Sequence, residues 1–567
     1  MNKLQFRILY REFLFRLMDV DVLAPSARGD SNELLGQFGS LLIAASLPFC
    51  VLALGLATTR RYPTPEQMMS GVWSAFHLMV STTMLVVGLF GILSWDSTFL
   101  DRRDVMVLAP LPVRGRTMFL AKISAVAVGL SITIVALNWA PGAVLPLLIA
   151  SGAGFAGFVR FFTVWWLVLA MAGAFMYCVL LGVQGVIAQL PRRWFLRLSS
   201  WLQIGSFALL LAVYMLHPRL LTPQALAAAA NQRTLAWLPP YWFLGLFSEW
   251  SGLSANGHTV MAPLAARALA GLAIAIVGAG GAFLLSYFRT LRKIVEEPDI
   301  LPVARGATWL PRFGDLRRTA LVHFAIRTLL RSRQHRMILA FYIGFGFAIV
   351  ALFMKGAIQG RQFLAGMDPL VQVNPEMLVS SVVMLVAWLL GTRVVFSMPL
   401  DLRANWVFRV TPVLGGPAIL PATRRSLLTL SVAPVWIGCA AIFLWMWPWR
   451  PVAIHLAALA FLASILADVC LFGFRKIPFT CSYLPGKSKV HLTFWFCSLM
   501  ILAIIQLAVN WEVRALHTPF GGPAVVAGLG LLALAARVST NFRSREDIAV
   551  QWEESHSDET IVLGLNA

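Results

Sequence analysis

The dominant feature of this 567-residue chain is a series of long apolar runs that recurs from residue 38 to residue 536. Most of these runs approach the roughly 20 residues that an α-helix needs to cross the hydrocarbon core of a bilayer. Hydrophobic residues make up 59% of the chain and charged residues only 13%, which is low for a soluble domain. A transmembrane β-barrel would show short alternating segments instead. The sequence therefore predicts an all-α integral membrane protein.

Polar breaks between the runs predict about twelve transmembrane helices in two halves of six. The predicted spans are 38–58, 74–95, 123–140, 162–188, 199–215 and 265–288, then 337–354, 377–396, 427–446, 452–472, 493–509 and 524–536. The stretch 141–150 is either re-entrant or an extension of the third span. The domains are an amphipathic N-terminal segment (1–37), two transmembrane halves (38–288 and 337–536), a linker with an interface helix (289–336) and a tail (537–567).

The basic residues predict the orientation of these helices. Of the 46 Lys and Arg residues, 35 lie in the two terminal segments and in the loops that share their side of the membrane, and 9 lie in the opposite loops. Because cytoplasmic segments carry the excess of Lys and Arg, both termini are expected in the cytoplasm. The net charge of +21 thus reflects membrane topology. A nucleic-acid surface is not expected, because no basic run is interleaved with aromatics on a soluble domain.

The chain has the marks of an internal duplication. The segment DRRDVMVLAPLP follows the second span of the first half, and DLRANWVFRVTP follows the second span of the second half. At an offset of 300 residues, four of twelve positions are identical, including Asp101/Asp401, Arg103/Arg403 and Pro112/Pro412. Because six spans return the chain to the same side, the halves form a parallel repeat, an arrangement found in some transporters.

Motifs for chemistry on this chain are scarce. We find no HExxH, GxSxG or paired-carboxylate motif, and no CxxC pair that would suggest a metal site, so an enzyme is not expected. The segment CSYLPGKS at 481–488 ends like a phosphate-binding loop but has Cys481 where that motif requires glycine. The intramembrane polar candidates are Asp468, His77 and Gln184, since ionisable groups in spans mark transport pathways and amides commonly bridge helices.

The two charged, proline-punctuated loops and the amphipathic segments that open each half resemble the permeases of ABC-2-type ABC exporters, in a fused twelve-span form. The stretches that carry the resemblance are FLDRRDVMVLAPLPVRGRTMFLAK at 99–122, LPPYWFLGL at 238–246 and SMPLDLRANWVFRVTP at 397–412. The resemblance implies a bacterial inner-membrane protein, without a bound cofactor of its own, powered by ATP-Mg on a separate ATPase subunit.

In that family the first cytoplasmic loop docks on the ATPase. The resemblance therefore assigns ATPase coupling to the loops that contain Asp101, Arg103, Pro112, Asp401, Arg403 and Pro412. Proline-bounded loops between long spans could also transmit a rigid push. Two fused halves imply two ATPase copies per chain, and a homodimer remains an alternative. Other expected contacts are with membrane lipid.

Two other functions remain open from the residues. One is an ion-coupled secondary transporter in which Asp468 is the coupling site. The other is a non-transporting membrane scaffold or enzyme subunit that binds a lipid or partner through outer-loop residues such as Trp242 and Trp250. The apolar faces fit a lipid, peptide, drug or glycan precursor equally, so the sequence does not define a substrate.

Overall fold

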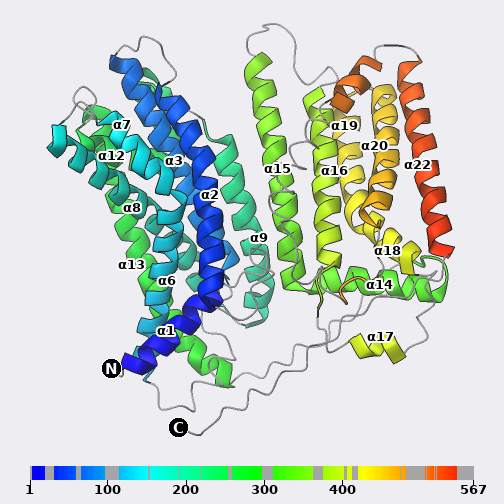
Figure 1. Cartoon of the computed structure of the whole chain (residues 1–567), viewed down its shortest axis with the longest axis horizontal. Helices are drawn as coiled ribbons and strands as arrows, with labels where there is room; N and C mark the ends of the chain where they lie inside the picture. Colours follow the sequence, from blue (N-terminus) through cyan, green and yellow to red (C-terminus); the bar gives the residue numbers. More distant parts are fainter. Residues whose placement is uncertain are drawn as a thin grey trace. The chain divides into compact units, whose positions relative to one another are not determined.

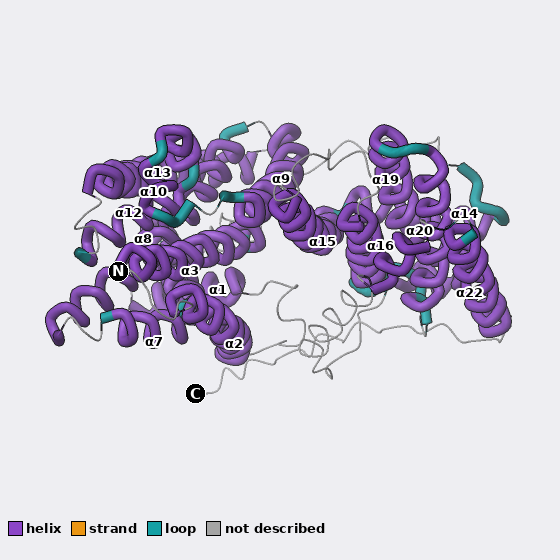
Figure 2. The backbone as a smooth tube through the Cα atoms, turned by 90° about the horizontal axis from the view of Figure 1, so that it is seen from above, coloured by secondary structure: helices purple, strands orange, loops and turns teal. Residues whose placement is uncertain are grey.

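The computed structural model of the chain describes residues 3–18, 31–58, 65–95, 114–150, 154–190, 192–218, 220–252, 258–296, 311–361, 375–400, 405–410, 419–472, 474, 476–480, 505, 507–515, 518 and 520–545. These residues form helices and turns, and none of them lies in a strand (Figure 2). The chain divides into two compact units, unit 1 from Met1 to Pro302 and unit 2 from Val303 to Ala567 (Figure 1).

Unit 1 contains the helices α1 (Lys3–Met18), α2 (Ser31–Thr58), α3 (Pro65–Leu93), α6 (Gly115–Leu137), α7 (Trp139–Ile149), α8 (Gly154–Ala188), α9 (Arg192–Leu216), α10 (Pro223–Ala227), η1 (Ala229–Asn231), α11 (Gln232–Trp237), α12 (Pro239–Ser251) and α13 (His258–Glu296). Unit 2 contains α14 (Leu316–Arg331), α15 (Arg333–Arg361), α16 (Pro375–Phe396), α17 (Trp406–Val410), α18 (Ile419–Leu427), η4 (Leu428–Val432), α19 (Ala433–Met446), α20 (Trp449–Cys470) and α22 (Gly521–Arg545). Residues 507–515 are also helical.

Ten helices in the described part of the chain are long and apolar enough to cross a membrane. They coincide with ten of the twelve predicted spans, so the prediction of a helical membrane protein is confirmed at that level. The predicted fifth span lies in α9, whose apolar part Trp201–Leu216 is shorter than these ten helices. The predicted eleventh span, 493–509, lies mostly outside the described residues. The total of twelve spans stays a prediction.

The stretch 141–150 forms the separate helix α7 rather than a continuation of α6. The break is at Asn138, whose backbone leaves the helical region with φ −100° and ψ 11°. Its side-chain amide donates to the hydroxyl of Thr83 on α3 at 2.9 Å and to the carbonyl of Ile134 at 2.9 Å. The buried amide therefore holds the break against α3, and α7 packs on α2 and α8.

The core of unit 1 forms around α12. Segment 216–264 was expected to be a loop, but α12 packs against α3, α8 and α13, and its Phe243, Leu244 and Phe247 are fully buried. The ring of Phe247 stacks on Phe76 with centroids 3.7 Å apart. Aromatic side chains bury large areas, so this short helix contributes strongly to the apolar core.

In unit 2, one span is built from three consecutive helical segments. The π-helical turn η4 joins α18 to α19, and Pro434 lies at the start of α19. Proline lacks an amide hydrogen and its ring crowds the carbonyl four residues earlier. A wider turn accommodates both effects, so Ile419–Met446 continues as one membrane-length element.

Each unit also carries an amphipathic helix at one end of its bundle. In unit 1, α1 packs on α6 and α2 through buried Phe13, Leu14 and Leu17, while Arg7 and Arg11 are exposed. The ammonium of the buried Lys122 on α6 lies 4.7 Å from the centre of the Phe13 ring.

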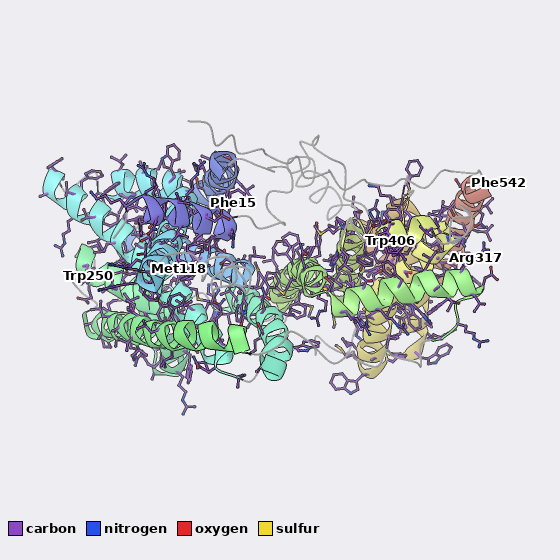
Figure 3. The ribbon with its side chains drawn as sticks, turned by 90° about the horizontal axis from the view of Figure 1, so that it is seen from below. Phe15, Met118, Trp250, Arg317, Trp406 and Phe542 are labelled. Carbon is purple, nitrogen blue, oxygen red and sulfur yellow. The ribbon has the colours of Figure 1, made fainter. Side chains whose placement is uncertain are left out.

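In unit 2, α14 lies across the ends of the long helices, with Arg317 near one of its ends (Figures 1 and 3). Its Val322 and Ile326 pack with Ala422 of α18. We refer to these ends of the two bundles as the α1 end and the α14 end. The amphipathic segments expected at the start of each half are thus both helices.

Candidate functional site

The predicted coupling residues lie outside the described part of the chain. This applies to Asp101, Arg103 and Pro112 in unit 1, and equally to Asp401, Arg403 and Pro412 in unit 2. The described residues around them are the end of α3, the start of α6, the end of α16 and the short helix α17. The candidate site therefore consists of these elements and of the residues that contact them.

Helix α17 occupies the middle of the second predicted loop, at the α14 end of unit 2 (Figure 1). Its Trp406, labelled in Figure 3, is 63% exposed and its Val410 is 74% exposed. The half-buried Phe408 faces the other way and makes an edge contact with the Phe324 ring of α14, with centroids 5.1 Å apart. The short helix thus rests on α14 and presents an apolar face outward.

A turn at 476–480 ties α17 to the end of α16. The amide of Phe479 donates to the carbonyl of Phe396 at 3.0 Å, and the carbonyl of Phe479 accepts from the amide of Leu400 at 3.0 Å. The side-chain amide of the buried Asn405, next to α17, donates to the carbonyl of Thr480 at 2.6 Å. The end of α16 and the start of α17 are therefore bonded to the same turn.

Phe479 is the strained residue in this turn. Its φ of 66° lies in the left-handed region, which is rare for a bulky residue. The ring is 1% exposed and contacts the rings of Phe396 and Phe324 at centroid distances of 5.4 Å and 6.3 Å. Burial of this side chain offsets a backbone strain of order 1–3 kcal/mol.

The side chains of His335 and Arg393 complete the attachment of α16. His335 of α15 contacts the carbonyl of Met398 through Nε2 at 3.1 Å. Arg393 of α16 donates from Nε to the carbonyl of Cys470 at 2.7 Å, and its guanidinium carbon lies 4.4 Å from the centre of the Phe474 ring. The end of α16 is consequently bonded to α15, α20 and the 476–480 turn.

The corresponding end of α3 in unit 1 is held by neutral side chains. Gln184 of α8 donates to the carbonyl of Gly91 at 3.3 Å, and Gln203 of α9 donates to the carbonyl of Ile92 at 2.7 Å. The indole of Trp95 donates to the hydroxyl of Ser199 at 3.0 Å. The last carbonyls of a helix have no partner within the helix, so these amides bond groups that would otherwise be orphaned.

Asp468 lies in an ion pair rather than alone. Both of its carboxylate oxygens accept from Arg424, one from Nε at 2.7 Å and one from Nη2 at 3.1 Å. A second guanidinium, that of Arg537, lies 3.9 Å from Oδ1. Because Arg424 was counted among the loop charges, sequence reasoning missed this pair.

His77 of α3 is buried among aromatic rings of unit 1. Its ring centroid lies 4.5 Å from that of Tyr241 and 5.1 Å from that of His217, and its Nδ1 lies 3.5 Å from the Ser81 hydroxyl. The structure does not bring His77, Gln184 and Asp468 together: the first two are in unit 1 and Asp468 is in unit 2.

His455 is part of a buried chain of hydrogen bonds that sequence reasoning missed. It contacts Ser381 of α16 and Glu512 of the 507–515 segment, each at 2.8 Å. Glu512 was assigned to a loop beyond the eleventh span, so no sequence signal placed it beside a histidine 57 positions earlier. Within the described residues, no group of His, Cys, Asp and Glu side chains could hold a metal ion.

Comparison of the sequence with protein-family models, with curated proteins and with solved structures gives no match.

Proposed function

We propose that this chain is the membrane-spanning permease of an ATP-driven exporter of the bacterial inner membrane, which works with a separate ATPase. In this proposal the two units are parallel six-span repeats with both termini in the cytoplasm, and the α1 and α14 ends face the ATPase. Hydrolysis of ATP-Mg takes place on the partner.

The observation that carries the proposal is the exposed apolar face of α17, whose Phe408 contacts α14 and whose neighbour Asn405 is bonded to the 476–480 turn. Trp406 and Val410 are among the exposed large hydrophobic side chains, and they lie where the chain is predicted to meet the cytoplasm. Tryptophan at such a site is typical of a protein interface. Because Asn405 and the end of α16 share the 476–480 turn, a displacement of α17 would be transmitted to α16.

The geometry gives less support to ion coupling through Asp468. Both carboxylate oxygens already accept from Arg424, so protonation of Asp468 would leave a largely buried guanidinium without its anion. The permease proposal does not require this pair to open.

The test is purification of the tagged chain from its native membrane, followed by mass spectrometry and an ATPase assay. We expect a co-purifying chain with a GxxxxGK[ST] motif, near two copies per chain. Trp406→Ala should weaken its retention about 30-fold, as expected for a central interface tryptophan worth about 2 kcal/mol. The matched control is Trp445→Ala on α19, where the side chain is 86% exposed.

Two results would count against the proposal. The first is a chain that purifies without any ATPase and shows no ATP-dependent flux after reconstitution, which would favour the scaffold alternative. The second is full stimulation of the ATPase by each of three separate variants. These are Trp406→Ala, Asp101→Asn in the first loop and Asp401→Asn in the second loop.

A further inference from the structure

We infer that His455 and Glu512 form a buried binding site for a single exchangeable proton, with Ser381 fixing the position of the imidazole. The site is distinct from α17 and does not depend on the proposed ATPase. It joins three elements of unit 2, since Ser381 lies on α16, His455 on α20 and Glu512 in the 507–515 segment.

The three side chains are close together and buried. Ser381 Oγ lies 2.8 Å from His455 Nε2, and His455 Nδ1 lies 2.8 Å from Glu512 Oε1. Their exposed fractions are 3%, 1% and 8% in the same order. The Phe443 ring packs against the imidazole with centroids 5.6 Å apart. Burying an ionised side chain without a partner costs free energy, so any charge on His455 or Glu512 must be balanced within this contact.

Counting hydrogens determines which nitrogen carries a proton. Ser381 Oγ also contacts the carbonyl of Leu378 at 2.7 Å. A carbonyl only accepts, and a serine has one hydroxyl hydrogen, so that hydrogen is used on Leu378. The hydroxyl oxygen must then accept from His455, which requires a hydrogen on Nε2.

The contact between His455 and Glu512 then needs one further proton. If the proton is on Nδ1, the pair is an imidazolium and a carboxylate; if it is on Oε1, the pair is a neutral imidazole and a carboxylic acid. Both forms are neutral overall. Without the proton, the Nδ1 lone pair would face a carboxylate at the same 2.8 Å in a medium of low dielectric constant, where repulsion is strong. Loss of the proton therefore breaks the link between α20 and the 507–515 segment.

The same count argues against a hydrolytic serine. In a Ser-His-Asp triad the histidine accepts the serine proton through an unprotonated Nε2. Here the serine proton points to Leu378 and Nε2 is the donor. Ser381 is therefore a positioning residue for the imidazole and not a nucleophile.

Other ionisable groups on the packed elements are at least partly exposed or have other contacts. On α16 and α20, Glu376 is half-buried, Arg450 is exposed, and Arg393 and Asp468 have the partners described above. On the 507–515 segment, Arg514 is exposed, and α19 carries only Cys439. The neighbouring helices α15, α18 and α22 contribute described ionisable groups nearer the α14 end: His335, Arg336, Tyr342, Arg424, Arg425 and Arg537.

The proton makes stability depend on pH in a defined direction. In the unfolded chain, histidine is neutral above about pH 6.5 and glutamate is ionised, so the folded pair holds one proton more. Unfolding at alkaline pH therefore releases this proton, and stability falls as pH rises there. One proton corresponds to about a tenfold change in the unfolding equilibrium constant per pH unit, until the folded pair itself releases the proton.

The variants that test this are Glu512→Gln and, as the matched control, Glu376→Gln on α16. A glutamine amide can donate to Nδ1 as a carboxylic acid does, but it cannot titrate. The full-length chain in lipid nanodiscs, unfolded across a pH series, should lose this one-proton dependence in Glu512→Gln and keep it in Glu376→Gln. Equal pH dependence in the wild type and Glu512→Gln would overturn the proposal.

Two further measurements examine the wild-type chain itself, and variants serve only to assign the signals. Nitrogen-15 NMR of histidine-labelled protein in lipid, with His455→Gln to assign the signal, should show a protonated Nε2 at neutral pH. A hydrogen-free Nε2 would overturn the proposal. A fluorophosphonate probe should leave Ser381 unlabelled; labelling that disappears in Ser381→Ala would instead identify a nucleophilic serine.

Discussion

Units 1 and 2 satisfy their buried polar groups in different ways. Unit 1 joins its helices mainly through neutral amides and hydroxyls, as in the contact of Asn138 with Thr83 and the capping of α3 by Gln203. Unit 2 uses ionisable pairs, Arg424 with Asp468 and His455 with Glu512. A neutral contact holds helices at any pH, whereas an ionisable pair also responds to protons. Unit 2 thus has ionisable pairs between its helices where unit 1 has neutral contacts.

The largest effect is expected from breaking the Arg424–Asp468 pair. Arg424→Gln leaves a carboxylate that is only 4% exposed without its main cation, and breaking a buried pair costs about 3–5 kcal/mol. The free energy of unfolding, measured by thermal or denaturant unfolding in detergent, should fall by that amount.

The control for this change is Arg537→Gln. The Arg537 side chain is 39% exposed and 3.9 Å from Asp468, so its contribution should stay within about 1 kcal/mol. If the two variants were equally stable, the charged contacts of unit 2 would be no more important than surface pairs, and the contrast with unit 1 would disappear.

An intermediate effect is expected from the neutral contact in unit 1. Thr83→Val keeps the side-chain shape but removes the hydroxyl that accepts from the Asn138 amide. Leaving buried polar atoms without a partner costs about 1–3 kcal/mol, and this loss should not vary with pH. Unfolding measurements across the same pH series used for unit 2 would check it, with the exposed Thr163→Val on α8 as a nearly neutral control. A pH-dependent loss in Thr83→Val would contradict the division between the units.

The helical membrane architecture could be predicted because length and hydropathy alone determine it. Each of the ten spans from Phe38–Ala57 to Gly521–Phe542 contains a long apolar stretch, and no long-range contact is needed to recognise one. Helix α12 was missed for the opposite reason. It is short and begins with two prolines, features typical of a loop, and only its packing between α3, α8 and α13 makes it part of the core.

The contacts of the candidate residues could not be predicted in the same way. Asp468 was recognised as an ionisable group within a span, but its partner Arg424 lies 44 positions earlier in the chain. His455 and Glu512 lie 57 positions apart. Such pairs depend on which helix faces come together, and hydropathy carries no information about that. The exposed face of α17 was likewise hidden within a loop defined only by its charges and prolines.

The smallest effects are expected at glycines that face open space, and here the two units should behave alike. A Cβ at Gly278 of α13 or at Gly438 of α19 would meet no atom within 4 Å. Because alanine favours a helix over glycine by about 0.5–1 kcal/mol, Gly278→Ala and Gly438→Ala should each slightly raise the free energy of unfolding. At Gly245 of α12, a Cβ would lie 2.6 Å from the Cβ of Leu264 and 2.9 Å from the carbonyl oxygen of Met261, so Gly245→Ala should destabilise unit 1 instead. A destabilising Gly278→Ala would mean that this face of α13 is covered by another surface. Equal small gains in the free energy of unfolding from Gly278→Ala and Gly438→Ala would show that units 1 and 2 differ only in their buried polar contacts.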